Sequence, residues 1–449
     1  MNSDLNRSQL VEECDKAFAD VLGADLTVPL VRGGETRYVN LDHAASTPPL
    51  RAVADHLALI TPHYSSIHRG AGYASLVSTS MYEAARDSVA RFLCARPDDK
   101  VVFTRNTTDS LNLLSRCVPG EVLVLDVEHH ANLLPWQAGS HHVLLAADTL
   151  AETLAELNRT LAERGSALLA ITGASNVTGE VVPLERIVEI AHRHGTRVVV
   201  DAAQLAPHRR IDVTRSDVDY VAFSGHKTYA PYGAGVLLGR PDWLDEAPPH
   251  LAGGGAVREV RLDGALWAAA PERHEAGSPN VLGVAALAKA CDVVGELLGD
   301  ASAEHEARLR ERLVNGLERL DGVSTHRFWA DCTDVIGVVT FSVAGYDAGL
   351  VAAYLSAEHG IGVRDGRFCA HPAITRLGLP RSGAVRASFG LGSRLDDADR
   401  LVAAVEQLLI EGPGWGYAQL NGRWTPAPDL RPMPEWLPVG TNAVPRLCS

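Results

Sequence analysis

One lysine stands apart from the other basic residues of this chain. Of the 41 Lys and Arg residues only four are lysines, at positions 16, 100, 227 and 289, so arginine serves wherever positive charge alone is needed. Lys227 follows the apolar run YVAFS and lies in SGHKTYAPYGAG, among small residues. A partly buried lysine loses its proton readily and can form a Schiff base, which the guanidinium of arginine cannot. Lys227 is therefore a candidate Schiff-base residue, and the alternative is a surface lysine at the end of a strand.

An acidic residue follows another apolar run, 26 residues before this lysine. RVVVDAAQ places Asp201 at the C-terminal end of a predicted strand, with Gln204 just after it. Ligands of open α/β sheets bind outside the carboxyl ends of the strands. A carboxylate there can keep the pyridine nitrogen of pyridoxal phosphate (PLP) protonated, which makes that cofactor an electron sink. The alternative is an Asp that caps a helix predicted for DAAQLA.

A third segment, FTRNTTDSLNLL, joins a predicted strand to a predicted helix through Asn106, Thr107, Thr108 and Asp109. Hydroxyl and free N–H groups at the N-terminus of a helix bind phosphate groups. The motif is weak on its own, because it also describes ordinary helix capping. It gains weight from its position before Asp201 and Lys227.

These residues need a sheet to bring them together. Apolar runs alternate with helical patterns between residues 100 and 240, which predicts an α/β domain with a parallel or mostly parallel sheet covered on both faces. The seven runs predicted as strands are VVFT, EVLVLD, HVLLAA, ALLAIT, RVVVDAA, YVAFS and GAGVLLG. After residue 280, two long helices precede a mixture of strands and helices, which predicts a smaller α+β domain.

We therefore expect four segments. Residues 1–45 pack with the smaller domain, 46–285 form the large domain that binds PLP, 286–411 form the small C-terminal domain, and 412–449 form an extended tail. The tail is rich in Pro and Trp and has no evident helical or strand period. Its expected role is packing on the body or across a subunit interface, and a lid over the active site is the alternative.

The composition limits the partners of the chain. A formal charge of -14 over 449 residues argues against nucleic acid or an anionic membrane as the main partner. No apolar stretch approaches the ~20 residues of a membrane span. The seven cysteines are scattered, without a CxxC pair, which suits a reducing compartment. We expect a cytoplasmic protein.

The segments quoted above, with EHHANLLPW, SNVTGE and EAGSPN, resemble the class V aminotransferase family of fold-type I PLP enzymes. Within it the chain is most similar to the group II cysteine desulfurases and selenocysteine lyases. The resemblance extends from LDHAASTPP at residues 41–49 to DDADRLVAAVEQL at 396–408. It implies a PLP enzyme that acts on an amino acid as a homodimer with shared active sites, and it leaves room for a sulfur-acceptor protein.

The resemblance also implies roles for individual residues. Lys227 would form the Schiff base and move a proton at Cα, Asp201 would pair with the pyridine nitrogen, and Gln204 would bond the phenolic oxygen. His129 would stack on the ring and shuttle protons. The phosphate would be held by Thr107, Thr108, Ser224, His226 and, from the other subunit, Ser278. The substrate would be bound by Asn176, Arg386, His68 and Arg364.

A cysteine in VRDGRFCAHP occupies the place of the desulfurase nucleophile. The attacking group must be a thiolate, and cations near Cys369 such as Arg364, Arg367 or His371 would favour it. The alternative is a small buried side chain without a catalytic role. Likewise, Arg386 could form a structural ion pair instead of binding the substrate.

Two positions depart from the family pattern. Arg367 and Phe368 stand where the family usually has two histidines, and Gly72 stands where another histidine is common. A C–S lyase, epimerase or aminotransferase acting on a specialised amino acid therefore remains the alternative function, and a catalytically dead scaffold remains a third. We expect no metal site, because the neighbouring histidines at 129–130 and 141–142 point to opposite faces of a strand. The absence of a GxxxxGK motif argues against an NTPase.

Overall fold

A seven-stranded sheet forms the centre of the large domain. The structure, a computed structural model, describes residues 16–68 and 70–437, so the first fifteen residues of the expected N-terminal segment and the last twelve of the expected tail lie outside it. All seven apolar runs enter the sheet, as β4 (Lys100–Thr104), β5 (Val122–Leu125), β6 (His141–Leu144), β7 (Leu168–Thr172), β8 (Arg197–Asp201), β9 (Tyr220–Ser224) and β10 (Gly235–Gly239). The order is β4-β10-β9-β8-β7-β5-β6, and β10 runs antiparallel to both of its neighbours. The predicted α/β fold with a mostly parallel sheet is confirmed.

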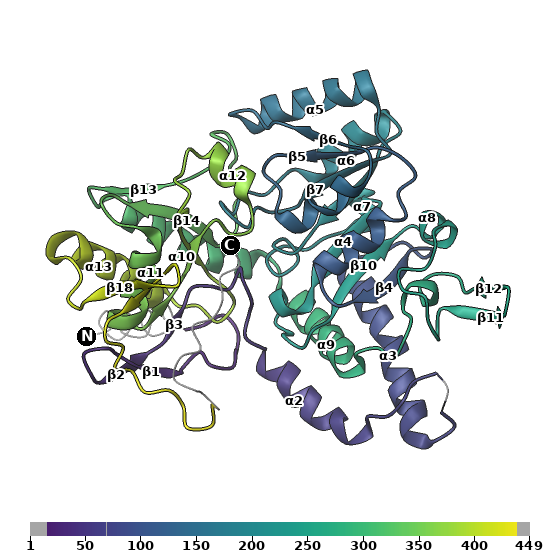
Figure 1. Cartoon of the computed structure of the whole chain (residues 1–449), viewed down its shortest axis with the longest axis horizontal. Coiled ribbons are helices and arrows are strands. Elements are labelled where there is room, and N and C mark those ends of the chain that lie inside the picture. Colours follow the sequence, from purple (N-terminus) through teal and green to yellow (C-terminus); the bar gives the residue numbers. More distant parts are fainter. Residues whose placement is uncertain (1–15, 69, 438–449) are drawn as a thin grey trace, which may run out of the picture.

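The side chains of each central strand alternate between two hydrophobic layers. In β8, Val198 and Val200 belong to one buried cluster, whereas Val199 belongs to the cluster on the opposite face. This alternation is the period of two that a strand imposes. The first layer is covered by α3 (Tyr73–Phe92), α5 (Leu150–Arg164), α6 (Leu184–Arg193) and α9 (Val281–Leu297), and the second by α4 (Thr107–Ser115) and α8 (Pro241–Glu246). Figure 1 shows these helices around the sheet on the right of the view.

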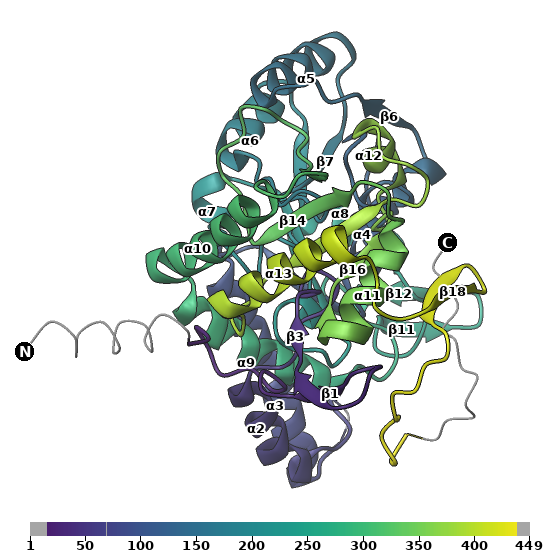
Figure 2. The ribbon, with the colours of Figure 1, turned by 90° about the vertical axis from the view of Figure 1, so that its left-hand side faces the viewer.

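The smaller domain is built on a four-stranded antiparallel sheet. Its order is β13-β14-β17-β16, with β13 (Val323–Thr325), β14 (Val338–Val343), β16 (Arg364–Gly366) and β17 (Ala384–Ser388). The covering helices are α10 (Asp300–Leu317), α11 (Ala348–His359) and α13 (Leu395–Glu411). Figure 2 shows these helices in front of β14. A short helix, α12 (His371–Arg376), follows the loop that bears Cys369.

Chain segments on both sides of the large domain meet in this smaller domain. The hairpin of β1 (Thr27–Pro29) and β2 (Glu35–Arg37) precedes β3 (Val39–Asn40), which pairs in parallel with β15 (Ile361–Gly362). Helix α9 spans the boundary expected at residue 286 and packs against α3 and α2 (Arg51–Ile60). The large domain therefore keeps α9, and the smaller domain begins after it.

The tail differs from the extended arm that we expected. Strands β18 (Tyr417–Leu420) and β19 (Arg423–Pro426) form an antiparallel hairpin that packs on α11. The turn is Asn421-Gly422, with φ of 51° and 78°. A two-residue Asn-Gly turn between strands is a strong hairpin signal, because both positions require positive φ. The sequence interpretation overlooked it among the prolines.

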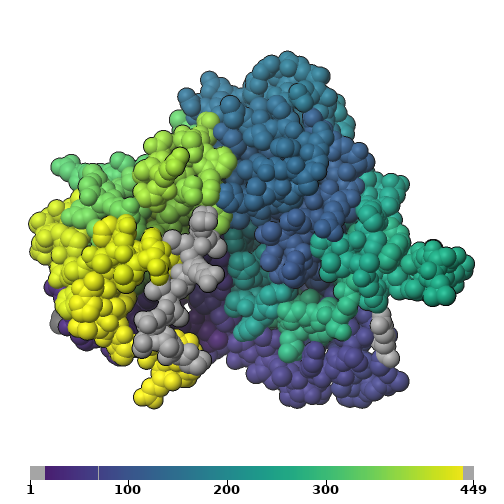
Figure 3. Space-filling view, viewed as in Figure 1, coloured from purple at the N-terminus to yellow at the C-terminus, as the bar shows by residue number. Residues whose placement is uncertain are grey.

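Two further features concern the surface. A hairpin of β11 (Val257–Arg261) and β12 (Gly264–Trp267) projects from the large domain, as Figure 3 shows at the right edge of the molecule. Over residues 16–68 and 70–437, none of the helices combines the length and the apolar character that crossing a membrane requires.

Candidate active site

A cavity of about 300 Å³ lies where the carboxyl ends of β7, β8 and β9 meet the loop after β16. This is the edge of an open α/β sheet at which ligands bind. Twelve of the predicted site residues line it, namely Thr107, Thr108, His129, Asn176, Asp201, Gln204, Ser224, His226, Lys227, Arg364, Cys369 and Arg386. They come from segments spread over 280 residues of the chain.

The N-terminus of α4 forms one wall of the cavity. Asn106 caps the helix, since its side chain accepts a hydrogen bond from the backbone N–H of Asp109 at 3.0 Å. The backbone N–H of Thr107 donates to Ser224 Oγ at 2.7 Å, and the two hydroxyl oxygens are also 2.7 Å apart. The N-terminus of a helix with hydroxyl groups beside it suits a phosphate group.

A glycine on the neighbouring strand allows this wall to form. A Cβ atom at Gly235 of β10 would lie 2.5 Å from the Cα atom of Asn106, which is closer than such atoms approach in proteins. The residue at position 235 must therefore lack a side chain for the cap of α4 to lie against the sheet. The close approach brings the first turn of α4 to the end of β9.

Lys227 and Asp201 lie at the ends of adjacent strands. Burial lowers the pKa of Lys227 to about 8, and Arg386 acts in the same direction, although the Asp201 carboxylate opposes both. Burial raises the pKa of Asp201, although its Oδ1 atom accepts a hydrogen bond from the Ala203 N–H at 3.0 Å. A lysine that is about half neutral near pH 8 can act as a nucleophile and as a base.

His129 begins a short turn after β5. Its Nδ1 atom accepts a hydrogen bond from the backbone N–H of Ala131 at 3.0 Å, so in the neutral ring Nε2 carries the proton. Burial lowers the pKa of His129 to about 3, with a further contribution from the charge of Lys227. The imidazole is therefore neutral over the physiological pH range.

The cavity residues fit the expected PLP. The Nε2 atom of Gln204 donates to the backbone carbonyl of Ala44 at 2.7 Å, whereas its Oε1 atom is buried without a partner in the described structure. A buried polar atom without a partner is costly, and a bound polar group removes that cost. Anion-binding groups at α4, a carboxylate at the end of β8 and this amide match the phosphate, ring nitrogen and phenolic oxygen of PLP.

Arg386 of β17 makes contacts on several sides. Its Nη1 donates to the Asn176 carbonyl at 2.9 Å and its Nη2 lies 3.1 Å from Asp42 Oδ1, while its Nε is buried without a partner among the described residues. The ion pair weighed as the alternative role for Arg386 is thus present. The guanidinium nevertheless lines the cavity, and burial lowers its pKa.

The loop that bears Cys369 has an unusual backbone. Phe368 and Cys369 have φ of 53° and 52°. This left-handed conformation is unfavourable for residues other than glycine. The carbonyl of Cys369 accepts a hydrogen bond from the His130 N–H at 2.8 Å, and the His130 and His371 rings meet edge to face with centroids 4.4 Å apart. The loop is therefore fastened to the turn that carries His129.

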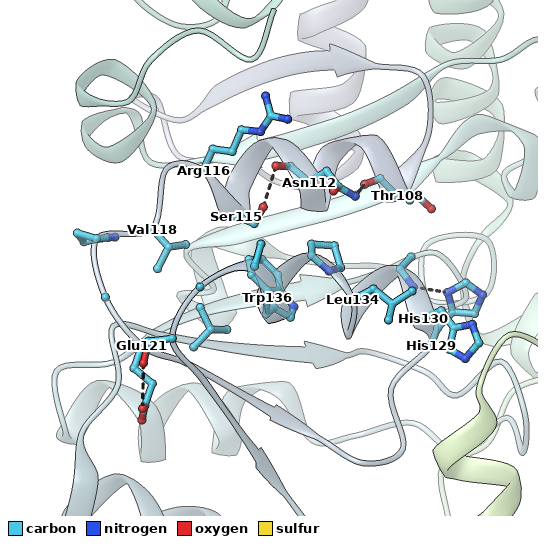
Figure 4. A pocket seen from close by; sticks show the side chains of 18 of the residues that line it. Thr108, Asn112, Ser115, Arg116, Val118, Glu121, His129, His130, Leu134 and Trp136 are labelled. Atoms are coloured by element: carbon cyan, nitrogen blue, oxygen red, sulfur yellow. Dashed lines mark hydrogen bonds between the residues drawn. The ribbon is translucent and has the colours of Figure 1, made fainter.

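Cys369 also borders a second, larger hollow of about 870 Å³ outside the first. Figure 4 shows Thr108, Asn112 and Ser115 of α4 along one wall, Leu134 and Trp136 along the other, and the adjacent histidines at one end. Cys369 therefore borders both the inner cavity and the outer hollow.

Two predicted residues lie elsewhere. His68 and Ser278 line a separate hollow of about 770 Å³, and His68 Nε2 lies 2.8 Å from Glu83 Oε1. The single chain therefore does not bring these residues to Lys227. Within the described ranges, no group of three or more His, Cys, Asp or Glu side chains is arranged to hold a metal ion.

Several residues at the site were not identified from the sequence. Asp42 and Phe368 contact Arg386, and Glu128, which is fully buried, accepts hydrogen bonds from Asn132 Nδ2 at 2.7 Å and the Thr172 N–H at 3.1 Å. Burial raises the pKa of Glu128 to about 8. The only available signal was their position inside or beside the motifs LDHAAST, RFCAHP and EHHAN.

Comparisons with known proteins agree with this geometry. Residues 39–401 match the family model described as Aminotransferase class-V. The cysteine desulfurase of Dickeya dadantii is 39% identical over 383 residues, which cover 82% of this chain and 91% of that protein. The structure of the cysteine desulfurase CsdA from Escherichia coli has a TM-score of 0.73 at 35% identity, covering 83% of this chain and 94% of that one. An apo cysteine desulfurase from Thermococcus onnurineus gives a TM-score of 0.75 at 31% identity, with the same coverage.

Proposed function

Since this chain belongs to the class-V aminotransferase family, we propose that it is a PLP-dependent cysteine desulfurase. It removes sulfur from L-cysteine, or selenium from selenocysteine, and leaves alanine, while Cys369 carries the sulfur as a persulfide. The observation that carries the proposal is that Cys369 lines the same cavity as Lys227 and Asp201. A nucleophilic thiol beside the PLP-binding residues is what sulfur transfer requires.

PLP supplies an aldehyde for amines and a ring that accepts electrons from the substrate. We assign its phosphate to the start of α4 and the end of β9, its ring nitrogen to Asp201, its phenolic oxygen to Gln204 and its ring face to His129. The phosphate-binding residues in this assignment are Thr107, Thr108, Ser224 and His226. Their gathering around one cavity supports the assignment.

Lys227 and His129 move protons. The lowered pKa of Lys227 leaves a large neutral fraction near pH 8, so Nζ can take a proton from Cα of the amino acid. The neutral imidazole of His129 holds its proton at Nε2, from where it can be given to the substrate. Both side chains line the same cavity, so both can reach one bound amino acid.

Asn176, Arg386 and Arg364 bind the substrate carboxylate. The partnerless Nε of Arg386 supports this role, because a buried donor gains a full hydrogen bond from an incoming oxygen. The thiolate of Cys369 then bonds to the substrate sulfur as the Cβ–S bond breaks. The electron pair of that bond stays with the carbon skeleton, which takes up a proton and leaves as alanine.

The enzyme acts as a homodimer in this proposal. His68 and Ser278 share a hollow away from the cavity of their own chain, which supports a two-fold arrangement in which both reach the partner's site. The outer hollow beside Cys369 supports delivery of the sulfur there to an acceptor thiol on another protein. The cytoplasmic location expected from the sequence belongs to the same proposal.

Product analysis tests the function. PLP-loaded enzyme is incubated with L-cysteine and a reductant, and alanine, pyruvate and sulfide are measured. We expect alanine and sulfide from the wild type and from Cys94→Ala, whose exposed thiol lies outside the cavity. Cys369→Ala should form neither, yet keep the colour of bound PLP.

Two results contradict the proposal. Pyruvate and sulfide from both wild type and Cys369→Ala would mean β-elimination without a nucleophilic cysteine. Bound PLP without any product would exclude L-cysteine as the substrate.

A further inference from the structure

Phe368, the residue directly before Cys369, contacts Asn176 and Arg386, two of the three residues assigned to the substrate carboxylate. Its backbone carbonyl accepts a hydrogen bond from Asn176 Nδ2 at 2.9 Å. The centroid of its ring lies 5.1 Å from Cζ of Arg386, within the range of a cation–π contact. Phe368 thus links Cys369 to both Asn176 and Arg386.

The ring of Phe368 is anchored in the core. The side chain is only 5% exposed and belongs to the main hydrophobic cluster of the large domain. Its backbone and that of Cys369 are both left-handed, which is disfavoured for these residues and persists only where surrounding contacts impose it. The contacts of Phe368 with Asn176 and Arg386 are among those that impose it.

The ring also restricts how a ligand reaches Arg386. Cζ of Arg386 lies over the face of this ring, and the N–H groups point outward in the guanidinium plane. Nη1 and Nη2 already bond to Asn176 O and Asp42, so Nε, which has no partner among the described residues, is the nitrogen left for a carboxylate.

We propose that Phe368 is a positioning residue through which Asn176 and Arg386 set the placement of the Cys369 thiol. The inference rests on the proposed function for its substrate, but the contacts that carry it exist in the chain itself. The thiol takes its reactive position because the carboxylate-binding pair holds the residue before it. The uncharged ring of Phe368 offers its face to the positively charged guanidinium.

Alkylation of the PLP-loaded enzyme by iodoacetamide tests this link. Labelling of Cys369 is followed by peptide mass spectrometry and divided by labelling of the exposed Cys94 in the same molecule. We expect Phe368→Leu to raise this ratio about fivefold, because the loss of one cation–π contact and its packing loosens the loop. Phe368→Met makes the same test with a side chain closer in volume.

Matched variants separate this link from general loss of packing. Phe368→Tyr keeps the ring, and Phe328→Leu removes a ring from the same buried cluster without touching the cavity, so both should stay within about twofold of the wild type. Arg386→Lys should raise the ratio as Phe368→Leu does, although it leaves the loop sequence unchanged.

Three results overturn the inference. The first is an unchanged labelling ratio in both Phe368→Leu and Phe368→Met. The second is a rise in Phe328→Leu as large as that in Phe368→Leu. The third is a rise in the Phe368 variants without a rise in Arg386→Lys. None of these readings depends on turnover. If L-cysteine yields no sulfide, the proposed function fails while the labelling still decides the role of Phe368.

Discussion

The Oγ atom of Ser224 lies 2.7 Å from both the backbone nitrogen and the Oγ1 atom of Thr107. These contacts join the end of β9, where Lys227 follows, to the first turn of α4. The lysine and the helix end assigned to the phosphate are thereby held in a fixed relation, although 120 residues separate them in the chain.

Replacing Ser224 by Ala should weaken PLP binding about tenfold, because the buried N–H of Thr107 loses its acceptor and the phosphate loses a hydroxyl. The dissociation constant is measured by titrating apoenzyme with PLP and following the absorbance of the bound cofactor. Ser216→Ala is the control, since its hydroxyl bonds only the backbone of the exposed helix α7 (Val213–Ser216). Equal affinities in the two variants would contradict the assignment.

A methyl group at Gly235 should disturb the same region from the other side. The added Cβ meets the backbone of Asn106 at 2.5 Å, so we expect Gly235→Ala to lower the free energy of unfolding by about 1–3 kcal/mol and to weaken PLP binding. Urea unfolding and PLP titration measure the two effects. At Gly264 no atom lies within 4 Å of an added Cβ, so Gly264→Ala should change neither; a similar loss in both variants would refute the argument.

The rate at which PLP combines with apoenzyme should follow the neutral fraction of Lys227. Burial lowers the pKa of this amine from 10.5 to about 8, so the rate should rise with pH and level off above a midpoint near 8. Stopped-flow absorbance over a pH series gives the profile, and Lys227→Arg should show no covalent incorporation. A midpoint at the ordinary value for lysine would contradict the burial argument.

The raised pKa of Glu128 should make the stability of the chain depend on pH. Its pKa is raised to about 8 in the folded chain, against 4.5 for the ordinary side chain, so between these values the folded state binds more protons than the unfolded state. Its contribution to stability therefore falls as pH rises through this window. Glu128→Gln removes the effect, and its free energy of unfolding relative to the wild type should increase from about pH 5 to about pH 8. Urea unfolding at both pH values measures the difference, and a constant difference would rule out the raised pKa.

Local patterns predicted the large domain and part of the cavity, and the family resemblance supplied most of the other cavity residues. The seven strands are short apolar runs, and Asp201 and Lys227 could be placed because Asp201 ends one strand and Lys227 lies three residues after another. Contacts such as that between Asp42 and Arg386 join segments that are 344 residues apart. No local sequence pattern predicts such contacts. The tail hairpin was missed for another reason, because its Asn-Gly turn was outweighed by the surrounding prolines.

Five ionisable groups in the cavity or directly beside it share one tendency. Burial raises the pKa of Asp201 and Glu128 and lowers the pKa of Lys227, His129 and His226, so each is shifted toward its uncharged form. An anionic ligand with a protonated ring alters this balance, since charges inside a low-dielectric cavity are stabilised chiefly by one another. Cofactor loading is therefore also a proton exchange with the solvent, and the heat it releases will depend on the ionisation enthalpy of the buffer.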